Sequence, residues 1–225
     1  FAFAIWNKKE QKLFIARDRY GIKPLYIAKF KKVFLFGSEV KSFLKHPSFQ
    51  TRIEHQSVLE YFTFQNFFTN KTLFKNVNTF KPGHFLYISS EDEIESEYWD
   101  YLFESSKKSI SFYRSKLLDK LKRAVKRQHM ADKEVSIGCY LSGGIDSGSI
   151  TSLSSSYIEN LKTFTVGYDT NSISGIEIIE DERAKAEYMS YLFKTEHYEM
   201  VLKSGDMENC LKKLMWLLEV PKIGQ

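Results

Sequence analysis

The feature that most constrains the fold is a short polar run with two adjacent glycines, SGGIDS at residues 142–147. An apolar stretch at 135–141 predicts a strand before the run, and residues 147–157 predict a helix after it. At such a strand-to-helix turn, backbone N–H groups and the helix N-terminus together bind phosphate, and glycines let the backbone come close to the anion. An ordinary turn with a serine or aspartate cap is the alternative interpretation.

The side chains of the run favour phosphate together with a metal ion. The hydroxyls of Ser142 and Ser147 are hydrogen-bond donors for phosphate oxygens. Asp146 would be a poor direct ligand, because a carboxylate and a phosphate repel each other, but it suits a Mg²⁺ ion held between the two. No lysine follows as in the G-x-x-x-x-G-K-[ST] loop, so this is a different kind of phosphate loop.

Helical and strand patterns alternate after residue 105, which predicts a parallel α/β sheet. The predicted helices cover 112–130, 147–157, 180–193 and 205–218, and the predicted strands cover 135–141, 162–166 and 196–202. In the first helix, Leu117, Leu121 and Val125 are spaced to form the buried stripe. The basic side chains of that helix are expected to form a solvated face: Lys116, Lys120, Lys122, Arg123, Lys126 and Arg127.

The first hundred residues follow a different pattern, which is typical of antiparallel hairpins. The pattern predicts short helices at 39–44 and 57–62, and strands at 1–6, 12–17, 24–28, 33–37, 83–88 and 94–99. A serine- and lysine-rich stretch at about 101–109 then predicts a domain boundary. The chain is therefore expected to hold two domains, 1–104 and 105–225.

The composition is that of a globular chain and excludes several classes of protein. Hydrophobic residues make up 43% and charged residues 27%, which excludes disorder, collagen and coiled coil. The net charge of +5 is too small to indicate nucleic-acid binding, and no apolar stretch approaches the ~20 residues of a membrane helix. Cys139 and Cys210 cannot form a disulfide framework, so a reducing, cytoplasmic compartment and inert, buried thiols are expected.

Both ends of the chain have the pattern of a fragment. The first six residues, FAFAIW, resemble the middle of a buried strand and include no initiating methionine. The last residues follow directly on a helical pattern. We therefore expect a piece of a longer protein, with a processed or naturally short protein as the alternative.

Several segments resemble a known family. SGGIDS is similar to the SGGxDS pyrophosphate loop of the N-type ATP pyrophosphatases, and ARDRYGIKPLY at 16–26 is similar to the ARDRxGxKPLYY segment of glutamine-hydrolysing asparagine synthetases. Residues 1–6 resemble the family's FAFALWD strand. Three further segments have counterparts in FASEIKALL, LPPGH and YWD, at residues 36–43, 81–84 and 98–100. Because two domains match in the right order, the chain is identified as a member of this family.

The resemblance implies a fold and a reaction. The fold would be part of an α+β, four-layer N-terminal-nucleophile glutaminase with antiparallel sheets, followed by part of an α/β ATP pyrophosphatase with a parallel sheet. The reaction would convert aspartate to asparagine through β-aspartyl-AMP, using ATP, Mg²⁺ and ammonia from glutamine and releasing AMP and pyrophosphate. The implied partners are these small molecules, with neither a membrane nor a nucleic acid, and a homodimer is compatible with the resemblance.

The resemblance also transfers part of a nucleotide site, residue by residue. The matching ATP-binding positions, with Asp146 as the Mg²⁺ ligand, are Leu141, Ser142, Gly143, Gly144, Asp146, Ser147 and Val166. The backbone of Val166 would recognise adenine. The family's cysteine nucleophile would lie upstream of Phe1, and its SGEGxDE motif would lie downstream of Gln225. We therefore expect this piece alone to be inactive in both reactions.

Four residues near this site have roles that the sequence leaves open. Gly148 stands where the family often has a serine, and glycine weakens a helix by up to ~1 kcal/mol relative to alanine. Asp181 and Glu182 resemble an acidic pair that opens the helix after the adenine strand, although helix-dipole capping explains them equally well. His197 lies in a T-x-H-x-E pattern, where a buried strand histidine is favoured over a catalytic one.

Three other interpretations of the chain stay open. The acceptor could be another carboxylate, as in related amidotransferases of polysaccharide or secondary-metabolite synthesis. A tRNA-modifying pyrophosphatase would use the basic helix, but the ARDRYGIKPLY segment argues against it. A non-catalytic remnant is the last interpretation.

Overall fold

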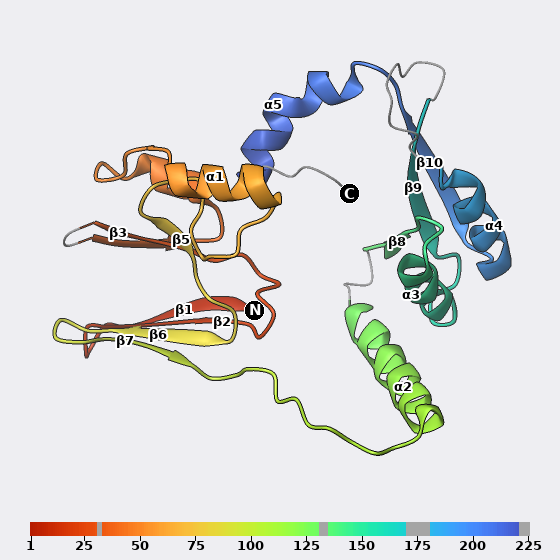
Figure 1. The fold of residues 1–225 in the computed structure, drawn as a ribbon, viewed down its shortest axis with the longest axis horizontal. Helices are drawn as coiled ribbons and strands as arrows, with labels where there is room; N and C mark the ends of the chain where they lie inside the picture. Colours follow the sequence, from red (N-terminus) through yellow and green to blue (C-terminus); the bar gives the residue numbers. More distant parts are fainter. Residues whose placement is uncertain (31–32, 131–134, 170–180, 221–225) are drawn as a thin grey trace. The chain divides into compact units, whose positions relative to one another are not determined.

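A computed structural model (Figure 1) describes the chain over residues 1–30, 33–130, 135–169 and 181–220. Contacts between Cα atoms divide the chain into two compact units. The first unit contains Phe1–Glu104 and Lys212–Gln225, and the second contains Ser105–Leu211. Each unit has its own β-sheets and its own buried residues.

The first unit is built from two antiparallel sheets. Four strands form one sheet in the order β1-β2-β6-β7, and three strands form the other in the order β4-β3-β5. The strands are β1 (Ala2–Asn7), β2 (Lys12–Arg17), β3 (Tyr26–Phe30), β4 (Val33–Gly37), β5 (Val77–Thr79), β6 (His84–Ile88) and β7 (Glu93–Glu97). The helices of this unit are the 3-10 helix η1 (Val40–Lys45) and α1 (His55–Phe64).

Apolar side chains fill the space on both faces of β3. On one face, a cluster joins this sheet to β2 and β6 through Ile15, Leu25, Ile27, Phe80 and Leu86. Successive residues of a strand point to opposite faces, so Ala28 belongs to a second cluster, which packs against η1 with Val40, Phe43, Phe49 and Val77. Figure 1 shows the two sheets as separate layers, with α1 on the outer side of the β4-β3-β5 sheet.

A buried carboxylate holds the turn that follows β2. Asp18 is 8% exposed, and it accepts hydrogen bonds from the backbone N–H groups of Tyr20 (3.1 Å), Ile22 (3.0 Å) and Lys23 (3.0 Å). Burial alone would raise the pKa of Asp18. The hydrogen bonds outweigh burial and hold the pKa of this carboxyl group well below its usual range.

The side chain of Arg17 also stabilises this turn. The Arg17 guanidinium donates to the carbonyl oxygens of Gly21 (2.8 Å) and Lys23 (2.9 Å), and also to that of Phe80. Gly21 has a φ of +63°, and a Cβ atom there would lie 3.0 Å from the guanidinium carbon. The ARDRYGIKPLY segment thus supplies the charges that fix its own turn.

The second unit contains one parallel sheet, with the strands in the order β10-β9-β8. The strands are β8 (Gly138–Tyr140), β9 (Lys162–Tyr168) and β10 (Glu196–Leu202), and the helices are α2 (Ile110–Gln128), α3 (Ile145–Ser155) and α4 (Arg183–Phe193). α3 contacts β8, and α4 contacts β9 and β10. Along β9, Thr163, Thr165 and Gly167 are buried, whereas Phe164 and Val166 are exposed. A last helix, α5 (Asp206–Leu218), crosses the division between the two units.

The predicted order of elements is confirmed, because antiparallel strands are followed by helices that alternate with parallel strands. The main differences are three: the predicted helix at 39–44 is a 3-10 helix, the strand predicted at 135–141 covers only Gly138–Tyr140, and the three-residue strand β5 (Val77–Thr79) was not predicted. The predicted stripe of α2 is wrong at Leu117, which is 69% exposed while Val125 is buried. α2 packs against α3, and of these two stripe residues only Val125, near the end of α2, is buried.

The structure also bears on two simpler expectations. The basic side chains of α2 are exposed, as predicted. None of the described helices is both long and apolar enough to span a membrane. Residue 180, where a helix is predicted to begin, lies outside the described residues.

Candidate functional site

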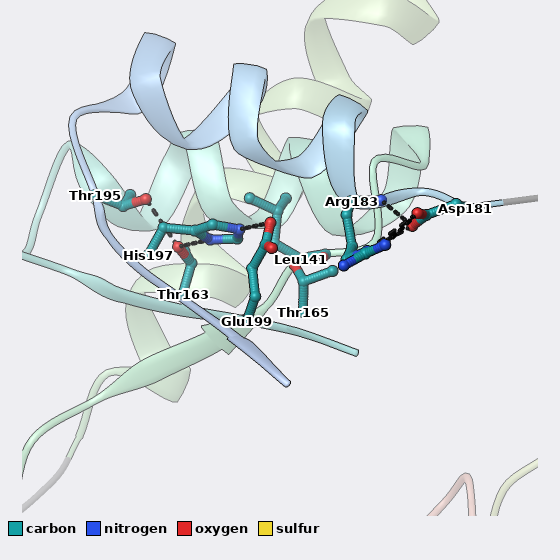
Figure 2. A network of polar contacts seen from close by, with 8 residues as sticks. All are labelled: Leu141, Thr163, Thr165, Asp181, Arg183, Thr195, His197 and Glu199. Atoms are coloured by element: carbon teal, nitrogen blue, oxygen red, sulfur yellow. Dashed lines mark hydrogen bonds and ion pairs between the residues drawn. The ribbon is translucent and has the colours of Figure 1, made fainter. Parts of the chain in front are cut away.

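The SGGIDS run begins at a residue that is fixed by the sheet. Leu141 is 1% exposed, and its N–H donates to the carbonyl oxygen of Phe164 at 2.9 Å. The hydroxyl of Thr165 donates to the carbonyl oxygen of Leu141, as Figure 2 shows. The loop therefore leaves β8 at a defined position beside β9.

Different structural constraints explain why two loop residues, Gly143 and Gly144, are glycine. Gly143 has a φ of +70°, a region that side chains disfavour, and a Cβ atom there would lie 2.6 Å from Cβ of Lys185. Gly144 is the N-cap of α3 and supplies no side-chain hydrogen bond. The first N–H groups of a helix have no partner inside the helix. Among the residues that the structure describes, the N–H groups of Ile145, Asp146 and Ser147 have no side-chain cap from Gly144, and a helix terminus of this kind can bind an anion.

The hydroxyl groups of Ser142 and Ser147 lie next to each other in this loop. The Ser147 Oγ accepts from the N–H of Ser142 at 3.1 Å, lies 3.0 Å from the Ser142 Oγ, and donates to the carbonyl oxygen of Gly144 at 3.2 Å. These bonds draw the two ends of the run together. Both predicted hydroxyl donors are therefore adjacent to the open N–H groups of α3.

Asp146 lies in the first turn of α3 with an exposed side chain. Within the part of the chain that the structure describes, its carboxylate forms no hydrogen bond or ion pair, so it can take a cation. No three His, Cys, Asp or Glu side chains gather as a metal cage in the described ranges. Mg²⁺ is commonly held by one or two carboxylates together with substrate phosphates, so the exposed carboxylate of Asp146 would suit this ion when a phosphate binds at the start of α3.

The start of α4 brings a basic side chain that the sequence interpretation missed. Arg183 crosses the backbone of Gly167, where an added Cβ atom would lie 2.3 Å from its Cδ. Asp181 binds the guanidinium at 2.6 to 3.0 Å and accepts from the N–H of Arg183 at 3.1 Å (Figure 2). These hydrogen bonds lower the pKa of Asp181 and raise the pKa of Arg183. In the sequence, the signal for this close approach is Gly167, which directly follows Val166, the residue expected to recognise adenine.

Asp181 and Glu182 have different structural roles. Asp181 anchors Arg183, whereas Glu182 is the N-cap residue of α4 and makes no side-chain cap hydrogen bond. The main-chain carbonyl of Glu182 accepts the first helical bond, from the N–H of Ala186 at 3.0 Å. Gly148, the departure from the family pattern, faces α4, since an added Cβ atom would lie 2.9 Å from Sδ of Met189.

Val166 lies in β9, one residue beyond the Thr165 that binds Leu141, and its side chain is 50% exposed on the opposite face. Its register partner in β10 is Met200. The structure thus places the backbone of Val166 on the strand next to β8, from which the glycine loop begins. A role in adenine recognition stays a prediction.

His197 takes part in a polar network inside the sheet (Figure 2). Its Nδ1 lies 2.9 Å from the hydroxyl of Thr163, which also lies 2.9 Å from the hydroxyl of Thr195. Its Nε2 lies 3.5 Å from a carboxylate oxygen of Glu199, and its side chain is 11% exposed. These contacts are those of a largely buried strand histidine, the interpretation that the sequence favours.

The two cysteines do not both match the expected buried thiols. Cys139 is partly buried in β8, whereas Cys210 is exposed and its Sγ donates to the carbonyl oxygen of Met207 at 3.3 Å. The expectation is wrong for Cys210 because no residue of α5 is buried. Neither thiol lies in the SGGIDS run.

Comparison with known proteins assigns the two parts of the chain. Residues 1–99 match a family model described as a glutamine amidotransferase domain, and residues 116–225 match one described as asparagine synthase. Asparagine synthetase (glutamine-hydrolysing) 3 from Bacillus subtilis is 31% identical over 98% of this chain and 37% of its own length. Asparagine synthetase (glutamine-hydrolysing) 1 from the same organism is 30% identical over 98% of this chain and 34% of its own length. Amidase chyE from Penicillium rubens is 33% identical over 76% of this chain and 28% of its own length.

The fold, the loop and these matches define a chain with an amidotransferase part and an α/β synthase part. Over 98% of its length the chain is similar to glutamine-hydrolysing asparagine synthetases. The chain spans about a third of the length of the two Bacillus subtilis relatives, at 37% and 34%.

Proposed function

We propose that the second part of the chain binds ATP, with its β- and γ-phosphates on the SGGIDS run. The observation that carries the proposal is the start of α3, where a glycine cap leaves N–H groups beside the hydroxyls of Ser142 and Ser147. The proposed ATP contacts are Leu141, Ser142, Gly143, Gly144, Asp146, Ser147 and, through its backbone, Val166. Asp146 would hold Mg²⁺, which offsets the charge crowded on the phosphates when it is bound.

The proposed reaction is that of a glutamine-dependent asparagine synthetase. The carboxylate of aspartate attacks the α-phosphorus of ATP, the bond to the β-phosphate oxygen breaks, and pyrophosphate leaves. Ammonia from glutamine then displaces AMP from β-aspartyl-AMP and gives asparagine. The open N–H groups of α3 would stabilise the negative charge on the leaving pyrophosphate, as fixed dipoles do in other phosphate sites.

The proposed division of labour follows the two matched regions. Residues 1–104 would be part of the amidotransferase domain, of N-terminal-nucleophile type, and residues 105–225 part of the adenylating, pyrophosphatase-type domain. The matches to 1–99 and 116–225 support this division. Neither Cys139 nor Cys210 is proposed as the glutamine-hydrolysing nucleophile, since one lies in β8 and the other in α5.

Replacing Asp146 with asparagine tests the proposed ATP site. In the whole gene product, with aspartate, ammonia and Mg²⁺ present, we expect pyrophosphate release from ATP to fall at least about tenfold, because the charge near the phosphates is no longer offset. Asp119→Asn is the matched control, since Asp119 is an exposed carboxylate on α2 that pairs with Arg123. An unchanged rate in Asp146→Asn would rule out the metal role of this carboxylate.

A second candidate keeps the chemistry and changes the acceptor carboxylate. The similarity to amidase chyE, a relative named for a different activity, favours keeping this candidate. A screen of carboxylate acceptors for AMP formation separates the two. Asparagine formation from aspartate supports the first candidate, and AMP formation only with another acid supports the second.

A further inference from the structure

A buried carboxylate near the end of the described chain binds the backbone of the amidotransferase part. The two oxygens of Glu219 accept hydrogen bonds from the N–H groups of Val40 (2.6 Å) and Lys41 (2.5 Å). These N–H groups begin η1, where no intrahelical partner exists, and the preceding Glu39 supplies no side-chain cap. The Glu219 side chain is only 8% exposed, so the carboxylate has exchanged water for these two donors.

Lys41 adds a second set of contacts to the same segment. Its ammonium lies 3.8 Å from Oε1 of Glu219 and donates to the carbonyl oxygen of Trp216 at 3.1 Å. It also lies 5.9 Å from the centre of the Trp216 ring, within cation–π range. Beside these polar contacts, Met215 and Trp216 line an apolar pocket together with Phe49 and Phe74. One lysine and one glutamate thus join the two segments by charge, hydrogen bonds and apolar packing.

The backbone at Glu219 shows that the segment is held in place. Glu219 has a φ of +58°, which costs a residue other than glycine roughly 1 kcal/mol. Its N–H donates to the carbonyl oxygen of Met215 at 2.9 Å, so the turn ends α5. A non-glycine residue keeps this conformation when its surroundings determine it, and here the carboxylate contacts do so.

The two sides of this contact come from the two matched regions of the sequence. Val40 and Lys41 lie within residues 1–99, and Glu219 lies within residues 116–225. All three belong to the first compact unit. The segment that ends α5 is therefore continuous in sequence with the synthase part and packed with the amidotransferase part.

We infer that Glu219 is a positioning residue that couples the two half-reactions. This inference rests on the proposed function, in which ammonia made by one part is consumed by the other. Docking of the α5 end on η1 fixes the synthase segment to the amidotransferase core. Glutamine hydrolysis then yields ammonia that reaches the acyl-adenylate before it is lost to solvent. Without the contact between Glu219 and η1, glutamate and amide product would no longer form in equal amounts.

Hydrogen exchange of the whole gene product tests the contact itself. We expect Glu219→Ala to speed exchange of the N–H groups of Val40 and Lys41 at least about tenfold, because their acceptor is removed. Glu208→Ala is the matched control, since Glu208 is an exposed carboxylate in the first turn of α5. Glu219→Asp, which keeps the charge, should restore part of the protection. Unchanged exchange in Glu219→Ala would overturn the contact, whatever the protein catalyses.

Product ratios test the coupling. With glutamine as the donor, Glu219→Ala should raise the ratio of glutamate to amide product at least about twofold, because lost ammonia yields no amide. With ammonia as the donor, its rate should match that of Glu208→Ala, which excludes simple unfolding as the cause. Faster exchange with an unchanged ratio would overturn the positioning role. If the protein formed no amide from either donor, the proposed function would be refuted. The hydrogen-exchange result would still show whether Glu219 binds the N–H groups of Val40 and Lys41.

Discussion

Replacing Asp18 with alanine is expected to lower the free energy of unfolding of the first unit by at least about 3 kcal/mol. The carboxylate is buried and binds the N–H groups of Tyr20, Ile22 and Lys23. Alanine would leave these donors without their acceptor and would leave Arg17 as an unbalanced charge in the same turn. Phe80, whose carbonyl oxygen Arg17 binds, belongs to the core between the two sheets. The damage would therefore reach the packing of the sheets.

Tryptophan fluorescence during urea unfolding measures this effect on the relevant unit. The chain has three tryptophans, Trp6, Trp99 and Trp216, and all of them lie in the first unit. Asp92→Ala is the control, because this exposed carboxylate near β7 should change stability by no more than about 0.5 kcal/mol. Equal stability of Asp18→Ala and Asp92→Ala would contradict the role of Asp18.

The same carboxylate predicts a dependence of stability on pH. Its folded pKa lies below the unfolded value of about 3.9. Its stabilisation is thus fully present above that value and is lost as the pH falls toward the folded pKa. The difference in unfolding free energy between the wild type and Asp18→Asn should stay constant above about pH 5 and narrow below about pH 4. A difference that does not narrow would show that Asp18 is not the titrating group.

Replacing Gly143 with valine is expected to reduce pyrophosphate release from ATP in the whole gene product at least about 100-fold. Valine strongly disfavours the φ of +70° at this position, and its Cβ atom would lie 2.6 Å from Cβ of Lys185 and 3.3 Å from the carbonyl oxygen of Glu182. Neither neighbour is the end of a flexible chain, so the loop would have to move. Its movement would displace the N–H groups of α3 that we propose bind phosphate.

Gly148→Ala is the matched control for this loop. Gly148 is also buried against α4, but its neighbour at 2.9 Å is Sδ of Met189, which can swing away. Alanine also favours the helix by up to about 1 kcal/mol, so this variant should keep its rate within about threefold. Loss of activity in Gly148→Ala but not in Gly143→Val would contradict the account of the loop.

The sequence predicts those parts of the site that depend on neighbouring residues. A strand, two glycines and a helix are contiguous, and so the loop at 142–147 and its place in a parallel sheet follow from local pattern alone. The positive φ of Gly143 is also a local property. Leu117 shows the limit of this reasoning, because helical spacing says which residues share a face but not how far the neighbouring helix extends.

Contacts between distant residues could not be predicted in this way. Arg183 meets Gly167 only because α4 folds back along β9, and the bond between Lys41 and Glu219 joins residues 178 positions apart. The charged pair at 17 and 18 was visible only as part of a family pattern. Its function in tying the turn depends on a carbonyl 63 positions away, at Phe80.

The products that the whole gene product makes from ATP test the central claim most directly. If the SGGIDS loop holds the β- and γ-phosphates of ATP for adenylation, incubation with aspartate and ammonia should give AMP and pyrophosphate in equal amounts, matched by the amide product. Chromatography of the nucleotides with a pyrophosphate assay measures both. Formation of ADP and phosphate in place of AMP and pyrophosphate would contradict the account.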